Sequence, residues 1–389
     1  MPNSIQKEED SIVEIPAFEK ITSKAEVFFN PEMKFNRDIS CLVLACNFES
    51  KIEGRDSYLV CDSMAASGIR TIRYFKELEK IEKKYKKQIF SIYSNDINQQ
   101  AISQIENNLR LNKLDDLIDK KIILSQKDAN CLVLRNKFDF VDIDPFGSSV
   151  YFLNSFFANS MHKSILATTY TDTAPLCGTY PKTCFIRYFA KPAHIDNMHE
   201  IALRILIAKI NIISAMHEKI YHPLLSFSKR HYFRLFGESR KSSKGKLKEN
   251  MKNIGYMLYC SKCMERKFVE LDLFNNLKIC SCGEKYNYAG PLWTGALHDT
   301  GFCKKLLSYT EDKKMKDFIE IIKEENEIDG ICYSIHEFGK TAKMDILKTN
   351  EMISRLKKNG FNASRCHLSG LFVKTDKMLN VKEYRKIVK

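Results

Sequence analysis

Short β-rich runs alternate with helical segments through the first half of the chain. The predicted strands are residues 58–62, 89–95, 122–125, 138–143 and 165–170, and the predicted helices are residues 69–87 and 97–112. Because parallel strands need long crossover connections, usually helical, this alternation predicts a doubly wound α/β fold with a parallel sheet. Ligands of such sheets bind beyond the carboxyl ends of the strands, so those positions are the first candidates for function.

Small or acidic residues follow the first three predicted strands. The loop Asp62–Gly68 lacks the G-x-G-x-x-G pattern of dinucleotide sites and is similar to the glycine-poor first loop of S-adenosylmethionine-dependent methyltransferases. Asp96 follows the second strand, where an acid can accept both hydroxyls of a ribose, and Asp128 and Ala129 follow the third, where a carboxylate can meet an adenine amine. The alternative for each Asp is an ordinary helix cap.

An acid, a proline and an aromatic residue follow the fourth predicted strand as Asp144, Pro145 and Phe146. The exocyclic amine of a nucleobase is a poor nucleophile because its lone pair is delocalised into the ring. A carboxylate that accepts one N–H can aim that lone pair at a methyl group, while proline fixes the backbone and the aromatic ring stacks on the base. Asp142 is expected to face the other side of the strand. The alternative is a tight turn with a helix cap.

These motifs make the sequence recognisable from about residue 27 to residue 376. It resembles the tRNA (guanine-26 N2)-dimethyltransferase family, archaeal type. The motifs that carry the resemblance are Val27-Phe28-Phe29-Asn30-Pro31 with Asn36-Arg37-Asp38, Asp62 to Arg70, Asp144 to Ser148, the long loop Thr171 to Cys184, His231 to Arg234, and Ser364 to His367.

The resemblance implies transfer of two methyl groups from S-adenosylmethionine to the N2 amine of guanosine 26 in tRNA. The implied cofactor contacts are Arg37 and Arg70 on its carboxylate, Asp96 on the ribose, and Asp128 with Ala129 on the adenine. The implied catalytic residues are Asp144, which accepts from the target amine, and Phe28 and Phe146, which sandwich the guanine. Two alternatives stay open: an amino methyltransferase acting on adenine N6, and a non-catalytic RNA-binding protein with a decayed cofactor site.

Positive charge dominates the chain, since 62 Lys and Arg stand against 48 Asp and Glu, a net charge of +14. This excess favours a polyanionic partner, although a lysine-rich proteome would also produce it. Residues 229–252 hold nine basic residues against two acids and read as a phosphate-binding segment or as a solvated charged linker. We therefore expect a methyltransferase domain over 1–235, a basic linker over 236–255, and a smaller tRNA-binding α/β domain over 256–389.

Four cysteines form two close pairs about twenty residues apart, Cys260 with Cys263 and Cys280 with Cys282. This spacing predicts a structural Cys₄ zinc ribbon in the C-terminal domain. The second pair is C-x-C, one residue shorter than the C-x-x-C usual in the family, which leaves reduced structural thiols as the alternative. The sequence pattern predicts neither a membrane span nor a signal peptide. We expect a monomer that binds tRNA, without membrane association, in the cytoplasm, or in the nucleus of a eukaryote.

Overall fold

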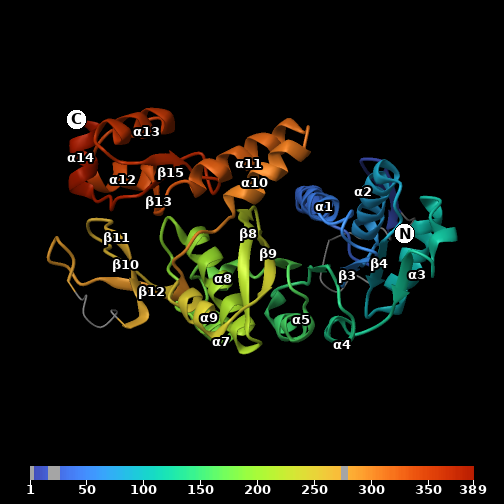
Figure 1. The fold of residues 1–389 in the computed structure, drawn as a ribbon. Helices are drawn as coiled ribbons and strands as arrows, with labels where there is room; N and C mark the ends of the chain where they lie inside the picture. Colours follow the sequence, from blue (N-terminus) through green and yellow to red (C-terminus); the bar gives the residue numbers. More distant parts are fainter. Residues whose placement is uncertain (1–3, 16–26, 273–278) are drawn as a thin grey trace. The chain divides into compact units, whose positions relative to one another are not determined.

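The structure is a computed structural model that describes residues 4–15, 27–272 and 279–389. The chain divides into two compact units. The colours of Figure 1 follow the sequence, and its bar gives the residue numbers. Unit one comprises Met1–Tyr170 and Phe236–Lys241, and unit two comprises Thr171–Leu235 and Ser242–Lys389. Within the described ranges, no helix combines the length and the apolar character needed to cross a membrane.

Unit one contains most of the predicted strands and helices. Its strands are β1 (Ser4–Glu8), β2 (Ser11–Ile15), β3 (Tyr58–Asp62), β4 (Phe90–Asn95), β5 (Ile122–Ser125), β6 (Phe140–Ile143), β7 (Ser164–Tyr170) and the second part of β9 (Tyr232–Lys241). Its helices are α1 (Lys34–Glu49), α2 (Ile69–Tyr85), α3 (Gln99–Leu111), α4 (Ala129–Arg135) and α5 (Leu153–Asn159), with short 3₁₀ turns η1 (Pro31–Met33), η2 (Asp115–Leu117) and η3 (Ser149–Phe152).

The sheet confirms the predicted doubly wound α/β fold. Its strand order is β5-β4-β3-β6-β7-β9-β8, and β3 pairs in parallel with both β4 and β6. The chain moves outward from β3 to β5 and then returns to β6, so the order reverses between β3 and β6, where Asp62 lies opposite Asp142. Every residue of β6 and β7 is buried, as expected for parallel strands covered on both faces. The reversal places the ligand-binding edge beyond β3 and β6.

An N-terminal hairpin of β1 and β2 packs against α3 and α2 of the same unit (Figure 1). Asn108 on α3 and Asn112 directly after it accept hydrogen bonds from the backbone N–H groups of Glu14 (2.8 Å) and Ile12 (3.1 Å). These side chains pair backbone groups on β2 that its partner strand β1 does not cover. The hairpin therefore has a fixed position that brings Glu8 of β1, only 5% exposed, into the interior of unit one.

Unit two contains two smaller sheets and most of the later helices. Its helices are α6 (Thr173–Leu176), α7 (Pro181–Tyr188), α8 (Met198–Met216), α9 (Lys244–Met251), α10 (Thr300–Tyr309), α11 (Lys313–Asn326), α12 (Ile335–Ala342), α13 (Thr349–Lys358) and α14 (Val381–Val388). Its strands are β8 (Lys219–Lys229), the first part of β9, β10 (Ile254–Tyr259), β11 (Arg266–Glu270), β12 (Asn287–Trp293), β13 (Ile331–Ser334), β14 (Ala363–Arg365) and β15 (Phe372–Thr375). One sheet has the order β11-β10-β12 and the other β13-β15-β14.

The prediction of a basic linker over 236–255 is wrong. These residues form the end of β9, all of α9 and the start of β10. The first six residues of β9, Tyr232 to Gly237, are all buried, so this basic segment begins as an interior strand. Its hydrophobic side chains outweigh the charge pattern that suggested a linker. The two units meet along the chain after residues 170, 235 and 241, so a boundary does fall at 235 but none falls at 255.

Candidate active site

Arg70 is the centre of a buried polar cluster at the reversal point of the sheet. It follows the loop after β3, on the first turn of α2, and its side chain is 7% exposed. One guanidinium nitrogen, Nη1, lies 3.2 Å from Asp142 Oδ2, and the other, Nη2, forms an ion pair with Asp144. Asp142 and Asp144 therefore meet on one cation. The expectation that Asp142 faces away is wrong, because alternate positions along a strand share a face.

Asp62, at the end of β3, is the third carboxylate near Arg70. It is 1% exposed and accepts a hydrogen bond from Thr71 Oγ1 at 2.8 Å. Burial raises the pKa of Asp62 to about 7, against the opposing charge of Arg70 and with the help of Asp142. Three carboxylates and one guanidinium carry −3 and +1, a net charge of −2 when all are ionised. The cluster therefore favours a cationic ligand.

Arg37, on α1, is largely occupied by Glu8 from the N-terminal hairpin. Its Nε donates to Glu8 Oε2 at 2.9 Å, its Nη2 pairs with Glu8 Oε1, and Nη2 also donates to the Asn30 carbonyl at 3.0 Å. Glu8 bridges as well to Arg73 Nη1 at 2.9 Å. Although burial acts against it, Arg37 and then Arg73 lower the pKa of Glu8. Among the described residues, Nη1 of Arg37 has no hydrogen-bond partner, so that nitrogen is the one available to a ligand.

Phe28 and Phe146 lie in direct contact, with ring centroids 4.4 Å apart and planes at 79°. A base stacked between two rings needs about 3.5 Å on each face, or about 7 Å between the rings. The structure thus brings together the two residues expected to sandwich a guanine, in an arrangement that closes the space between them. Phe146 is 50% exposed, so its ring has room to move.

The acids after β4 and β5 hold the loops of the same sheet edge. Asp96 accepts from the backbone N–H groups of Ala66 (3.0 Å) and Asn98 (2.9 Å). Asp128 caps α4 by accepting from the N–H groups of Asn130 and Cys131, and the next residue, Ala129, is 7% exposed. Asp128 is itself exposed, which leaves its second carboxylate oxygen open to solvent. Both acids therefore have a structural role, which neither requires nor prevents contact with a ligand.

Several residues of the site were missed by sequence reasoning. Asn36 Oδ1 and Ser40 Oγ accept from Arg70 Nη1 at 3.2 and 3.1 Å, and Tyr74 donates to Asp142. Asn95 joins two loops, since its amide donates to the carbonyls of Ser63 and Lys127. Helical spacing could have identified Tyr74 and Ser40, which stand four residues after Arg70 and Asn36 on their helices.

The loop after β3 also depends on one glycine. Gly68 begins α2 with φ +76°, a left-handed conformation that favours glycine. A Cβ at this position would lie 3.2 Å from the side chain of Ile105 on α3. A larger residue would therefore strain the turn that brings Arg70 to the acids.

The four predicted zinc ligands come together in unit two. Cys260 and Cys282 have their Sγ atoms 3.6 Å apart, Cys263 and Cys280 have theirs 3.4 Å apart, and all four sulfurs lie within 4.8 Å of one another. A tetrahedral Zn²⁺ with Zn–S bonds of about 2.3 Å separates its sulfurs by about 3.8 Å. The donor set therefore fits zinc. The short C-x-C pair can still supply two of the four sulfurs, because the chain turns directly after Cys282. Gly283 makes this turn with φ +88°.

A second cluster, His298, Glu325 and His367, consists of residue types that can bind a metal. The hydrogen bonds of His298 show which of its ring nitrogens carries the proton. Glu325 Oε1 lies 3.2 Å from His298 Nε2 and 2.9 Å from His367 Nδ1. The Ser226 N–H donates to His298 Nδ1 at 3.2 Å, and burial lowers the pKa of His298 to about 4. A neutral imidazole that accepts at Nδ1 carries its proton on Nε2, which then donates to Glu325. His298 and Glu325 therefore share a buried hydrogen bond, whereas neither ring nitrogen of His367 has a hydrogen-bond partner among the described residues.

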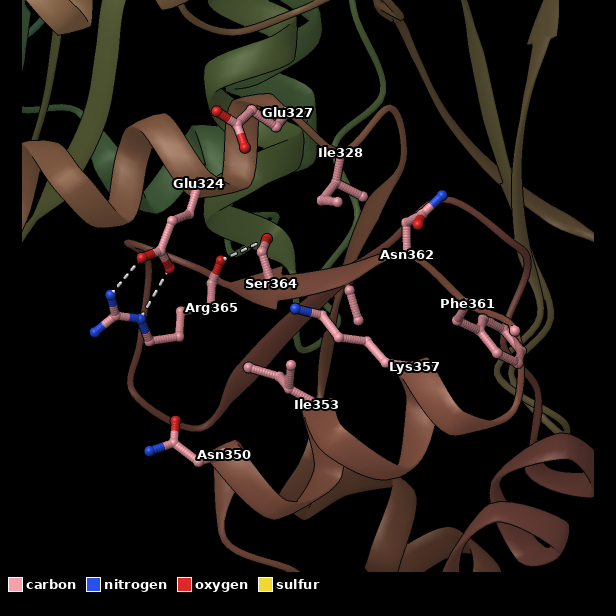
Figure 2. A pocket seen from close by; sticks show the side chains of 12 residues that line it. Glu324, Glu327, Ile328, Asn350, Ile353, Lys357, Phe361, Asn362, Ser364 and Arg365 are labelled. Carbon is pink, nitrogen blue, oxygen red and sulfur yellow. Dashed lines mark hydrogen bonds and ion pairs between the residues drawn. The ribbon is translucent and has the colours of Figure 1, made fainter.

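A groove of about 670 Å³ lies beside β14 and α13 in unit two, and Figure 2 shows its lining. Arg365 forms a double ion pair with Glu324 across its edge, at 2.8 and 3.1 Å. Glu327 and Lys357 add one charge of each sign. The charges balance, so this groove shows no preference for a polyanion.

Comparison with known proteins identifies relatives along nearly the whole chain. A family model described as N2,N2-dimethylguanosine tRNA methyltransferase matches residues 4–386. A tRNA (guanine(26)-N(2))-dimethyltransferase of Methanobrevibacter smithii is 36% identical over 386 residues, which cover 97% of this chain and 95% of that relative. A tRNA (guanine(26)-N(2)/guanine(27)-N(2))-dimethyltransferase of Aquifex aeolicus is 34% identical to this chain. The match covers 92% of this chain and 88% of that relative.

A solved structure is similar over the full length as well. It is the complex of Trm1 from Pyrococcus horikoshii with S-adenosyl-L-methionine, which matches with a TM-score of 0.82 and 27% identity. The match covers 99% of this chain and 100% of that one. Similarity in fold and similarity in sequence therefore point to the same family.

Replacing Arg70 by methionine should destabilise unit one strongly, because two buried carboxylates, Asp62 and Asp142, and the partly exposed Asp144 lose their shared cation. We expect a loss of about 3–5 kcal/mol in unfolding free energy at pH 8. The loss should shrink at pH 5, because Asp62, whose pKa is raised to about 7, is protonated there and no longer needs a cation. Urea unfolding at both pH values measures it. Arg110→Met, which removes an exposed ion pair with Glu106 on α3, is the matched control and should cost below about 1 kcal/mol. Equal losses for the two variants would contradict the central role of Arg70.

Proposed function

Because the chain belongs to the N2,N2-dimethylguanosine tRNA methyltransferase family, we propose that it transfers two methyl groups from S-adenosyl-L-methionine to the N2 amine of guanosine 26 in tRNA. The observation that carries this proposal is the Asp144 carboxylate, held by Arg70 beyond β6 at the reversal point of the sheet. A partly exposed acid at this edge is in the position where a doubly wound sheet binds its ligands.

Asp144 is the residue that would act on the amine. Arg70 engages its Oδ2, while its Oδ1 has no hydrogen-bond partner within the described part of the chain. A free carboxylate oxygen can accept one N–H of the amine, aim the nitrogen lone pair at the methyl group, and take up the proton that the methylated amine releases. Since the carboxylate is already fixed by an ion pair, little reorganisation accompanies the reaction.

Residues around Arg70 would hold the cofactor. When bound, S-adenosyl-L-methionine supplies an electrophilic methyl group on a positively charged sulfonium, and the net charge of −2 around Arg70 suits that cation. Arg37 can bind the amino-acid carboxylate through one nitrogen, Nη1, since Glu8 and the Asn30 carbonyl occupy the others. We propose that Asp96 binds the ribose hydroxyls of the cofactor and that Asp128 and Ala129 contact its adenine.

Phe28 and Phe146 would admit the guanine. Their present contact must open by about 3 Å for a base to enter, an approximate figure that follows from ring thickness. A guanine stacked in folded tRNA must also be extruded before it can reach Asp144, at a cost of a few kcal/mol. Contacts between basic side chains and phosphates are the natural source of that energy.

The two alternatives are less well supported. The relatives described above are named for guanine N2, which favours guanine over adenine N6. Arg70, Asp142 and Asp144 form an intact cluster, which favours an enzyme over an RNA-binding protein with a decayed site. The Aquifex relative is named for position 27 as well as 26, so the neighbouring guanine is the second candidate substrate.

We also propose a structural zinc ion held by Cys260, Cys263, Cys280 and Cys282, on the basis of the sulfur separations. Its role would be to fix the loops that follow β10 and precede β12. A monomeric state, tRNA as the partner and a cytoplasmic location complete the proposal.

Asp144→Asn should reduce methyl transfer by about 10²- to 10⁴-fold, because the amide can no longer accept the proton of the amine. The measurement is incorporation of labelled methyl groups into an unmodified tRNA transcript, followed by digestion and identification of the nucleoside. Binding of tRNA should stay within about twofold of the original protein. A transcript with adenine at position 26 controls for the site of modification. Normal turnover of Asp144→Asn would overturn the catalytic assignment.

Binding of S-adenosyl-L-methionine should strengthen as the pH rises from 6 to 8. The pKa of Asp62 is raised to about 7, so ionisation over this range adds negative charge beside the proposed sulfonium site. S-adenosylhomocysteine is the matched neutral ligand, since it lacks the charged sulfonium. The ratio of its Kd to that of S-adenosyl-L-methionine should increase by up to about tenfold from pH 6 to pH 8. In Asp62→Asn the ratio should stay constant, and a pH-independent ratio in the original protein would refute the argument.

Purified protein should contain one zinc ion per chain, measured by elemental analysis. Cys260→Ser removes one of the four ligands and should abolish stoichiometric zinc. Cys131→Ser changes an exposed cysteine at the start of α4, outside the cluster, and should leave the zinc content unchanged. A stable protein without metal would show instead that the four thiols are reduced structural residues.

A further inference from the structure

A groove of about 520 Å³ lies in unit two between α14 and the Cys260–Cys263 turn. Its lining includes five basic side chains and, among the described residues, no acid. The five are Lys262, Lys382, Arg385, Lys386 and Lys389. All five are exposed, so their charges face solvent. This concentration of one sign of charge distinguishes the groove from the balanced one beside β14.

Three of these side chains come from one face of α14, and the fourth, Lys389, directly follows the last residue of the helix. Lys382, Arg385, Lys386 and Lys389 follow the helical spacing i, i+3, i+4, i+7. The opposite face is buried through Tyr384 and Ile387, and Tyr384 stacks on Phe338 of α12 with ring centroids 5.3 Å apart. Packing therefore fixes which way the basic face points. At 1.5 Å per residue, the stripe is about 10 Å long.

The fifth basic residue is brought to the stripe by a backbone contact. The Val381 N–H, at the start of α14, donates to the Cys263 carbonyl at 2.9 Å. Lys262 precedes Cys263 and lines the same groove, as do Cys263 and Cys282. The cysteine cluster thus sets the distance between Lys262 and the helix.

Clustered cations of this kind repel one another, and like charges at i, i+4 weaken a helix. The acids that pair with them are few. Glu383 lies 3.2 Å from Lys386, and Glu284 lies 2.8 Å from Lys262, in exposed pairs that contribute little. An excess of positive charge remains, and a ligand with several negative charges in a row would relieve the repulsion.

We propose that this groove binds the phosphate backbone of the tRNA substrate, an inference that rests on the proposed function. A stripe of about 10 Å is long enough to reach more than one phosphate of a strand. The contacts are to phosphates, so they add affinity without reading the sequence. They would hold the tRNA while guanosine 26 is extruded, and they would contribute to the salt dependence of binding.

A second explanation of the same charges needs its own readout. A Zn²⁺ bound by four thiolates carries a net charge of −2, and nearby cations can stabilise it. In that case, removing the lysines would weaken metal retention without changing how tRNA binding depends on salt. The two explanations therefore predict different measurements.

The test is the triple variant Lys382→Ala, Lys386→Ala, Lys389→Ala in the full chain. The matched control is Lys304→Ala, Lys305→Ala, Lys314→Ala, which removes three exposed lysines of α10 and α11. For each protein, the Kd for an unmodified tRNA transcript is measured across a salt series, together with zinc content and the Kd for S-adenosyl-L-methionine. Turnover is measured at low and at saturating tRNA.

We expect the groove variant to bind tRNA about tenfold or more weakly. The slope of log affinity against log salt should fall by about one for each phosphate that the variant no longer neutralises. Its KM for tRNA should rise while kcat at saturation, zinc content and cofactor affinity stay unchanged. A slope equal to that of the control would overturn the proposal, and so would loss of zinc with an unchanged slope. Failure of the proposed function is a separate outcome, since the original protein would then transfer no methyl groups to tRNA.

Discussion

The ion pairs of Arg70 are the interaction on which unit one depends. A guanidinium that is 7% exposed would be costly to bury alone, and so would the carboxylates of Asp142 and Asp144. Together they tie the first turn of α2 to the end of β6. Asn36 and Ser40 bring α1 to the same guanidinium. One cation therefore sets the relative positions of three elements around the reversal point of the sheet.

The N-terminal hairpin extends this network rather than standing apart from it. Glu8 links Arg37 on α1 to Arg73 on α2, and Asp38 lies 2.6 Å from Arg73 on its other side. Acids and bases alternate from the hairpin to the helices, so each buried charge has a partner. This arrangement leaves Arg37 with a single available nitrogen, which makes the hairpin a determinant of how Arg37 can meet a ligand.

Much of the fold and part of the site could be predicted from the sequence, for reasons that particular residues illustrate. The strands of unit one are short buried runs bounded by polar loops, and the acids at their ends mark the functional edge. Local spacing also brought out the two cysteine pairs.

The contact of Glu8 with Arg37 could not be predicted, because it joins residues 29 positions apart through the fold. The strand β9 was missed because its basic residues suggested a linker, while its buried aromatic residues decide its place. The closed Phe28–Phe146 pair could not be foreseen either, since a motif gives residue types and not ring orientation.

The distribution of charge separates the two proposed ligands. The chain as a whole carries +14, which attracts a polyanion, yet the cluster around Arg70 carries −2 when ionised. Phosphates are therefore repelled from the acids that suit a sulfonium, while a neutral base edge is not. An extruded guanine can approach Asp144 only if its phosphates stay on basic surface, so a site of this kind selects a nucleobase that has left its helix. The same charge separation keeps the carboxylates from competing with the RNA backbone for cationic side chains. In the proposed function, binding the tRNA and aiming its amine are thus tasks for oppositely charged parts of the protein.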